Sequence, residues 1–216
     1  MPEPVKPRSY RSPVRASRAA ATRKAVLDGA QELFLADGYP ATTARAIAAV
    51  AGVSVDTVYA SVGRKPEVML ALLERAISGG EGAVAPDDRA YVQAVTAART
   101  AQEKLAIYAA AMRELIPRLA PLVGVLKQAG AADPDCAAVW AQISSRRAAN
   151  MRRFAADLRS TGELRDDLSD DEVADIIWST NAPEYYLLLV ERGWTPDRYE
   201  RLLVDVWTRM LLEPPS

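Results

Sequence analysis

The residues best placed to do chemistry lie between positions 43 and 65, where the sequence reads TARAIAAVAGVSVDTVYASVGRK. Small apolar side chains such as Ile47 and Ala48 would let one helix pack closely against another, and Gly52 supplies a turn that a side chain would obstruct. Ser54 is a preferred N-cap for the helix that follows. This pattern predicts a helix-turn-helix, whose second helix enters the major groove of DNA. An ordinary antiparallel helix pair within a bundle is the alternative.

The second helix would present hydrogen-bonding side chains to the nucleic acid. Its early residues Val55, Asp56 and Thr57 would face base edges, which carry the sequence information. Tyr59 and the ammonium group of Lys65 would reach phosphates, which fix position without reading sequence. Asp56 is unusual beside a polyanion, and two roles stay open for it. It accepts a hydrogen bond from a cytosine amino group, or it stabilises the positive end of its own helix.

The composition argues against an enzyme. The 216 residues include no histidine and one cysteine, Cys136, so the commonest metal ligand and the usual general base are missing. There is no glycine-rich phosphate loop and no cluster of carboxylates at metal-binding spacing. We therefore expect no catalytic residue, no cofactor and no metal. The lone cysteine fits a cytoplasmic protein, and no apolar run is long enough for a membrane helix, so no membrane partner is expected.

Charge is distributed unevenly along the chain. The formal net charge is -1, yet residues 1–24 carry seven basic side chains and one acidic side chain. Four prolines within residues 1–17 predict a flexible basic arm. A basic end on a mildly acidic body suggests that this end meets phosphate. A solvated, disordered tail without a partner is the alternative.

The elements that must position these residues are helical throughout. Apolar residues recur at helical spacing from about residue 18 to the C-terminus, and no convincing strand is present. Glycines at positions 79, 80 and 82 suggest a boundary near residue 80. We predict an all-α protein of about nine to ten helices: the arm over residues 1–17, a three-helix DNA-binding domain over residues 18–80, and a helical bundle over residues 81–216.

The C-terminal bundle offers a weaker signal for a ligand pocket. Arg147 falls in the middle of an apolar helical stripe, where a cation is costly unless it is paired. Its partner would be an internal carboxylate such as Glu184, or the acidic or polar group of a ligand. The candidate pocket residues are large apolar side chains on facing helices and the polar groups beside them: Tyr108, Met112, Trp140, Ile143, Arg147, Asn150, Phe154 and Trp178. Each of them also fits a plain hydrophobic core.

The stretch from about residue 23 to residue 77 resembles the DNA-binding domain of TetR-type regulators. The matching motifs stand in order and at the right gaps: Leu33-Phe34, Gly38-Tyr39, Thr42-Thr43, Ile47-Ala48, Ala51 to Ser54, Thr57 with Tyr59, and Lys65. The resemblance implies a set of DNA-contacting residues: Thr43, Arg45, Val55, Asp56, Thr57, Tyr59 and Lys65. Two positions depart from the family pattern, because Val62 stands where phenylalanine is usual and Arg64 replaces a small capping residue.

The same resemblance implies a function. Proteins of this type are ligand-responsive repressors that bind a palindromic operator as homodimers, and a small molecule releases them. Their last two helices form a four-helix bundle with the partner's pair. The apolar residues that would do so here are Ile176, Ile177, Leu188, Leu189, Leu202, Val206, Trp207 and Met210, unless their own chain buries them. An activator, a regulator without an effector and a helical interaction module are the remaining alternatives.

Overall fold

The computed structural model describes residues 13–80 and 84–213. Within these residues it contains ten α-helices and one short 3-10 helix, η1 (Pro86–Asp88). The described part of the chain has no strand beyond an isolated bridge between Leu164 and Leu212, so the all-α prediction is confirmed. None of the described helices is long and apolar enough to cross a membrane. The chain divides into two compact units between Val68 and Met69, and we describe each by itself.

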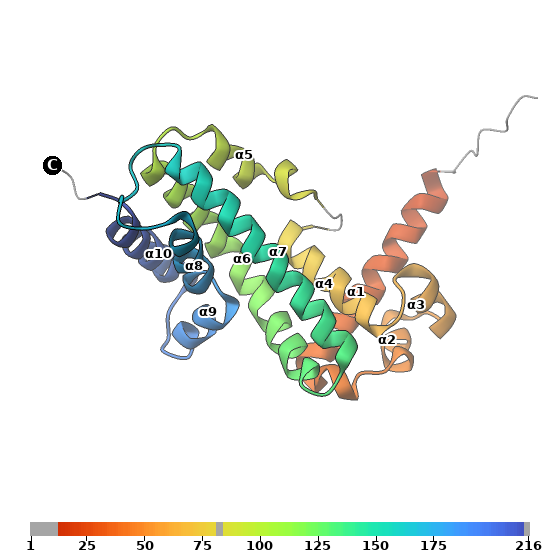
Figure 1. Cartoon of the computed structure of the whole chain (residues 1–216). Helices are drawn as coiled ribbons and strands as arrows, with labels where there is room; N and C mark the ends of the chain where they lie inside the picture. The colour runs from red at the N-terminus through yellow and green to blue at the C-terminus, as the bar shows by residue number, and fades with distance from the viewer. Residues whose placement is uncertain (1–12, 81–83, 214–216) are drawn as a thin grey trace, which may run out of the picture. The chain divides into compact units, whose positions relative to one another are not determined.

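The first unit contains α1 (Pro13–Ala41), α2 (Ala44–Ala51), α3 (Val55–Ser61) and the start of α4 (Lys65–Ser78) (Figure 1). Helix α1 begins at Pro13 and not at about residue 18, so the last residues of the expected arm are helical. The other residues of that arm, 1–12, lie outside the described residues. The backbone of α1 leaves helical geometry at Gly38, where the sequence predicts a stop.

The predicted caps build the turn between α2 and α3. The side chain of Thr43 accepts from the backbone N–H of Ala46, and Ser54 accepts from that of Thr57, so each helix has one of its free N–H groups satisfied. Gly52 ends α2 in the left-handed conformation, with φ of 66°, which costs glycine little. These local features let α2 and α3 pack against α1 around the buried Phe34, Ile47 and Val58.

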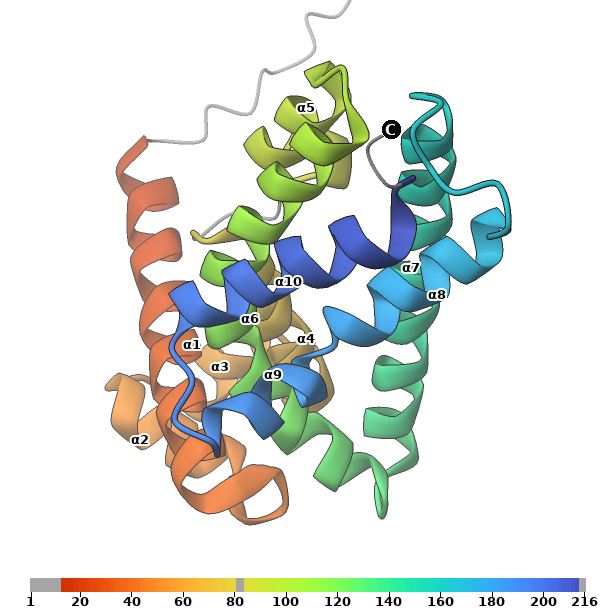
Figure 2. The ribbon, with the colours of Figure 1, turned by 90° about the vertical axis from the view of Figure 1, so that its left-hand side faces the viewer.

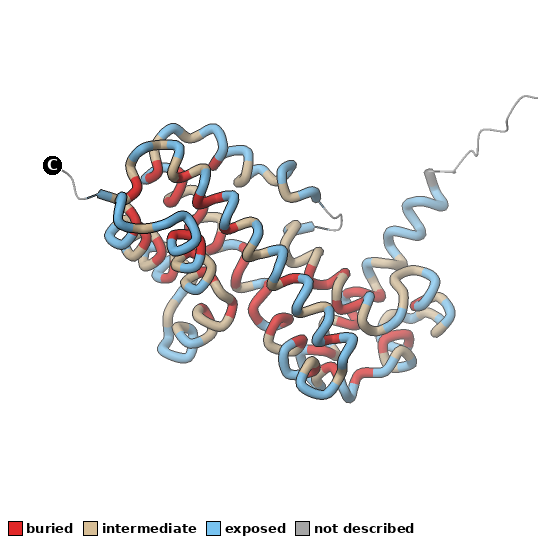
Figure 3. Tube along the Cα trace, in the orientation of Figure 1, coloured by how far each residue is buried: buried red, intermediate tan, exposed pale blue. Residues whose placement is uncertain are grey.

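The second unit is built around one long helix, α6 (Ala101–Gly130). Figure 3 shows that buried positions follow α6 closely. The other helices of this unit are α5 (Ala90–Ala97), α7 (Pro134–Arg159), α8 (Asp170–Thr180), α9 (Pro183–Val190) and α10 (Pro196–Leu211). Helices α5, α7, α9 and α10 all pack on α6, whereas α8 packs mainly on α7 (Figure 2). The break between α8 and α9 falls at Pro183, as its missing N–H predicts.

The apolar residues expected at a dimer interface divide into two groups. Ile177 and Trp207 are fully buried within their own chain, so they are core residues and not interface candidates. Leu188 and Met210 are 62% and 43% exposed, and they remain available to a partner. The remaining four are half-buried: Ile176, Leu189, Leu202 and Val206.

Candidate functional site

The outer face of α3 carries the side chains expected to read bases. Val58 faces the core and is 1% exposed, whereas the next residue, Tyr59, is 49% exposed. Asp56 is also exposed, and Val55 and Thr57 are half-buried. The hydroxyl groups of Thr57 and Ser54 lie 2.8 Å apart, which fixes the first turn of the helix. Thr43 and Arg45, at the start of α2, are exposed as well. Helix α3 therefore offers a free polar face.

Lys65 anchors the backbone of the first unit. Its Nζ donates to the carbonyl oxygens of Tyr39 at 2.8 Å and Thr42 at 3.1 Å. It also lies 4.1 Å from the centroid of the Tyr39 ring, where a cation is attracted to the π face. An ammonium group has three donors, so one N–H is left for a phosphate. The sequence pattern indicated only the phosphate role, and the anchoring role follows from the fold.

Arg23 was not singled out from the sequence. Its Nη1 donates to the carbonyl oxygen of Ser61 at 2.7 Å, which satisfies a free carbonyl at the C-terminal end of α3. Arg15 and Arg18 lie on the same helix, and together with Arg23 they line a shallow groove whose other wall includes Asp56 and Thr57. Three arginines of the described part of the N-terminal segment therefore lie beside the face that would read bases.

Lys65→Met is expected to lower the free energy of unfolding of the first unit by about 1–3 kcal/mol, because two partly buried carbonyl oxygens lose a charged donor. Amide hydrogen exchange of α1 and α2 would measure the loss. Arg45→Met is the control, since Arg45 is exposed and its replacement should leave the protection unchanged. Equal protection in both variants would mean that Lys65 has no anchoring role.

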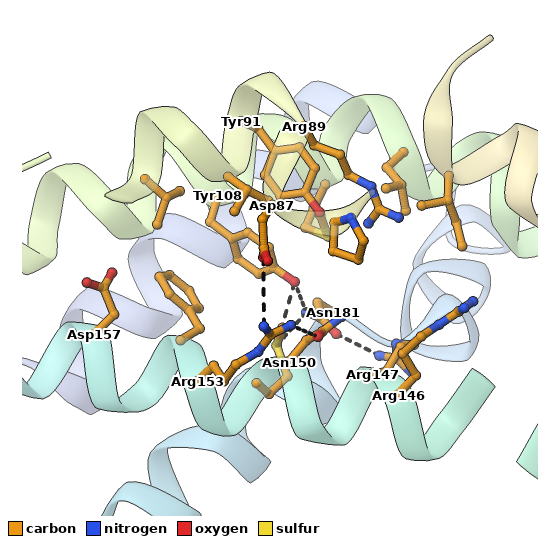
Figure 4. A pocket seen from close by; sticks show the side chains of 18 of the residues that line it. Asp87, Arg89, Tyr91, Tyr108, Arg146, Arg147, Asn150, Arg153, Asp157 and Asn181 are labelled. Atoms are coloured by element: carbon orange, nitrogen blue, oxygen red, sulfur yellow. Dashed lines mark hydrogen bonds and ion pairs between the residues drawn. The ribbon is translucent and has the colours of Figure 1, made fainter. Parts of the chain in front are cut away.

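A cavity of about 330 Å³ lies in the second unit, where α6 and α7 face each other beneath η1 and α5 (Figure 4). Six of the eight residues expected at a ligand pocket line it: Tyr108, Met112, Ile143, Arg147, Asn150 and Phe154. Trp140 and Trp178 do not line this cavity. Instead, the Trp140 ring lies below the ammonium of Lys127, 5.0 Å from its centroid, and Trp178 packs on the Arg147 guanidinium at 5.2 Å.

The polar centre of the cavity is Asn181, which the sequence did not indicate. Its amide nitrogen donates to the Tyr108 hydroxyl oxygen at 2.8 Å, and its amide oxygen accepts from Nη2 of Arg147 at 2.7 Å. The same nitrogen of Arg147 donates to the Trp178 carbonyl oxygen at 3.1 Å. Asn181 is the C-cap of α8 and stands two residues before Pro183, where the next helix begins. An asparagine at the end of a helix is the one feature of the sequence that could have drawn attention to it.

Of the two alternatives for the partner of Arg147, the structure forms no direct ion pair with Glu184, although the charge of Glu184 still acts on Arg147. Glu184 is paired with Lys127. Among the described residues, Arg147 donates hydrogen bonds only to neutral oxygen atoms. Burial lowers the pKa of the Arg147 guanidinium below its ordinary value. Burial also raises the pKa of the Tyr108 hydroxyl far above its ordinary value, and the positive charges of Arg147 and Arg89 act in the opposite direction. Tyr108 is therefore a neutral hydroxyl near two cations.

Seven further polar residues line the cavity and were not predicted from the sequence: Asp87, Arg89, Tyr91, Thr96, Arg146, Arg153 and Asp157. Arg89 and Tyr91 come from the start of α5, and Arg153 and Asp157 come from α7. Arg153 lies 3.7 Å from Asp87 of η1. Asp157 accepts from the buried Lys104 at 2.8 Å. No cluster of three or more cysteine, aspartate or glutamate side chains in the described residues is arranged to hold a metal ion.

Comparison with known proteins gives a family match for the helix-turn-helix region. Residues 26–72 match the family model "Bacterial regulatory proteins, tetR family". A search of curated proteins finds no match.

Solved structures share the fold over most of the chain. SmeT of Stenotrophomonas maltophilia, in its complex with triclosan, has a TM-score of 0.70 at 22% identity, covering 89% of this chain and 92% of its own. NalD, the secondary repressor of the MexAB-OprM multidrug efflux pump in Pseudomonas aeruginosa, has a TM-score of 0.72 at 16% identity, covering 92% and 100%. A protein from Saccharomonospora viridis in complex with choline has a TM-score of 0.68 at 19% identity, covering 89% and 98%. The family match covers the helix-turn-helix, and the rest of the chain shares the fold of these solved structures, so the two comparisons together support a TetR-type transcriptional regulator.

Proposed function

We propose that the protein is a cytoplasmic repressor, without enzymatic activity, that binds a palindromic operator as a homodimer and is released by a small molecule. The observation that carries the proposal is the exposed outer face of α3, which lies beside the groove lined by Arg15, Arg18 and Arg23. Polar side chains on such a face suit base edges, and arginines beside it suit the phosphate backbone. The proposed DNA contacts are those named from the sequence: Thr43, Arg45, Val55, Asp56, Thr57, Tyr59 and Lys65.

Two observations support the dimer and the effector. Leu188 of α9 and Met210 of α10 are exposed apolar side chains, as is Val190 at the end of α9, and contact with a second copy would remove them from water. The cavity of the second unit has the size and the mixed apolar and polar lining of a small-molecule site. Two proteins with similar structures hold small molecules, namely triclosan and choline.

Selection of bound sequences from a random DNA pool tests the DNA-binding part of the proposal. We expect an inverted repeat whose half-sites are about one helical turn apart, roughly 34 Å or slightly more. Sedimentation at micromolar concentration should show a dimer. A selected site without inverted symmetry, or a monomer at that concentration, would contradict the proposal, and a protein that binds no DNA would be an interaction module.

Thr57→Ala is expected to change which bases are selected, because a side chain that faces base edges contributes to sequence discrimination by about 1–3 kcal/mol. Tyr59→Phe is the matched comparison on the same helix. It should weaken binding to every sequence alike, because a phosphate contact carries no base information. Repeating the selection with both variants measures the two effects. A changed motif with Tyr59→Phe and an unchanged motif with Thr57→Ala would reverse the assignment.

A further inference from the structure

The side chains that line the cavity carry more positive than negative charges. Four arginines line it, and only two aspartates do. Asp157 is already paired with Lys104, and Asp87 lies next to Arg153. Within the described residues, no carboxylate lies at ion-pairing distance from the other three arginines: Arg89, Arg146 and Arg147. The cavity therefore has a surplus of positive charge.

Two of these three guanidinium groups are also short of hydrogen-bond acceptors. The Nε atom of Arg89 is buried and has no partner among the described residues. Arg147 uses Nη2 alone, on the neutral oxygens of Asn181 and Trp178. A guanidinium carries five N–H donors in a planar fork that matches a carboxylate. Glu184 acts on Arg147 only from outside the cavity lining and is paired with Lys127.

Three of the four arginines that line the cavity gather toward one end of it. In Figure 4, Arg89, Arg146 and Arg147 lie toward one end of the cavity, and Asp157 lies at the other. Tyr108 lies between these ends and is close enough to Arg89 and Arg147 for both charges to act on its hydroxyl. Most of the remaining lining is apolar or aromatic, and Phe154 packs 4.8 Å from the Tyr108 ring. This is the shape of a site for a molecule with one acidic end.

We propose that the effector is a small organic anion, whose apolar body fills the aromatic part of the cavity and whose acidic group is bound by Arg89 and Arg147. The inference rests on the proposed function and adds the chemical class of the ligand to it. The volume of about 330 Å³ lies near the lower end of small-molecule sites, so the body has no more than about three rings. A cation of the same size would be repelled by three guanidinium groups without carboxylate partners.

Two fluorescent probes test the charge preference, because they differ only by one sulfonate. 1-Anilinonaphthalene-8-sulfonate is an anion, and N-phenyl-1-naphthylamine is its neutral counterpart. We expect the anion to bind about 10- to 100-fold more tightly, which is the range for hydrogen bonds to a charged group. Arg89→Gln and Arg147→Gln should each reduce its affinity about 10-fold or more. Both variants should keep the neutral probe's affinity within about twofold, which also shows that the cavity is folded.

Arg153→Gln is the matched control, since Arg153 lines the cavity but already has Asp87 as a partner. It should retain the preference for the anion. Displacement of the anionic probe by 4-phenylbutyrate, but not by 4-phenylbutanamide, would extend the result to carboxylates. Equal affinity for the two probes would overturn the proposal. It would also be overturned if Arg153→Gln lost as much affinity for the anionic probe as Arg89→Gln and Arg147→Gln do, or if neither probe bound.

DNA release separates this inference from the proposed function. If the anions bind through Arg89 and Arg147 but leave the operator bound, the ligand class stands and the release step fails. If the neutral probe releases the operator as well as the anion does, release stands and the inference is overturned.

Discussion

Asp157→Ala is expected to lower the free energy of unfolding of the second unit by about 3–5 kcal/mol, the range for breaking a buried ion pair from one side. Its partner Lys104 has a side chain only 4% exposed. The Lys104 ammonium donates to Asp157 and to the carbonyl oxygen of Val95, both at 2.8 Å. Without the carboxylate, a charge would remain in a site that water scarcely reaches. Urea unfolding followed by circular dichroism would measure the loss.

Lys104→Met provides the control because the two ends of this pair differ in exposure. The Asp157 side chain is 35% exposed, so water can solvate its carboxylate once the ammonium is gone. Methionine also keeps much of the apolar stem. The loss should therefore be smaller, about 1–2 kcal/mol. If Lys104→Met cost as much as Asp157→Ala, the burial of the ammonium would not be the cause.

Trp207→Ala should have an effect of similar size, about 3–5 kcal/mol, which is typical when a buried aromatic side chain is removed from a core. Trp207 is 0% exposed. Its indole packs on the Tyr108 ring with centroids 5.7 Å apart, and its Nε1 donates to the Thr180 hydroxyl oxygen at 2.7 Å. Because Tyr108 lines the cavity, the variant should also weaken binding of the anionic probe.

Two further variants separate the contribution of the indole hydrogen bond from that of the buried ring. Trp207→Phe keeps a ring in the core but loses the N–H donor, so it should cost about 1–2 kcal/mol. Trp194→Ala removes an indole that is only half-buried and lies 3.8 Å from the Arg198 guanidinium, and it should cost about 1 kcal/mol or less. Thermal melting of the three variants ranks their losses of stability. A Trp194→Ala loss equal to that of Trp207→Ala would contradict the assignment of Trp207 to the core.

The helix-turn-helix could be predicted from sequence because its determinants are local. Thr43, Gly52 and Ser54 each act on the backbone within four residues of their own positions, and such short-range rules can be read directly from spacing. The role of Lys65 could not be predicted in the same way. Its acceptors are 26 and 23 residues away, so the anchoring depends on how α1 folds back at Gly38.

The cavity was predicted only in part, for a related reason. Helical phase placed Arg147 and Phe154 on one side of α7, and both line the cavity. Phase does not say which neighbour covers that side, so Trp140 and Trp178 were grouped with them although they pack elsewhere. Asn181 is 73 residues from Tyr108, its hydrogen-bond partner, and no spacing rule connects two positions that far apart.

The junction between α8 and α9 sets an energy scale for the response to ligand. Thr180 receives hydrogen bonds from Trp207 and Tyr199 of α10, whereas the next residue, Asn181, accepts from Arg147 in the cavity. An acidic ligand that binds the unused N–H groups of Arg147 and draws the guanidinium away from Asn181 would leave the buried Asn181 oxygen without its donor, at a cost of about 1–3 kcal/mol. Coupling free energies between two sites commonly span about 1–3 kcal/mol, or roughly 5- to 150-fold in affinity. If a small molecule releases the protein from DNA as proposed, one exchanged hydrogen bond next to a peptide held by α10 would supply a coupling free energy of this size.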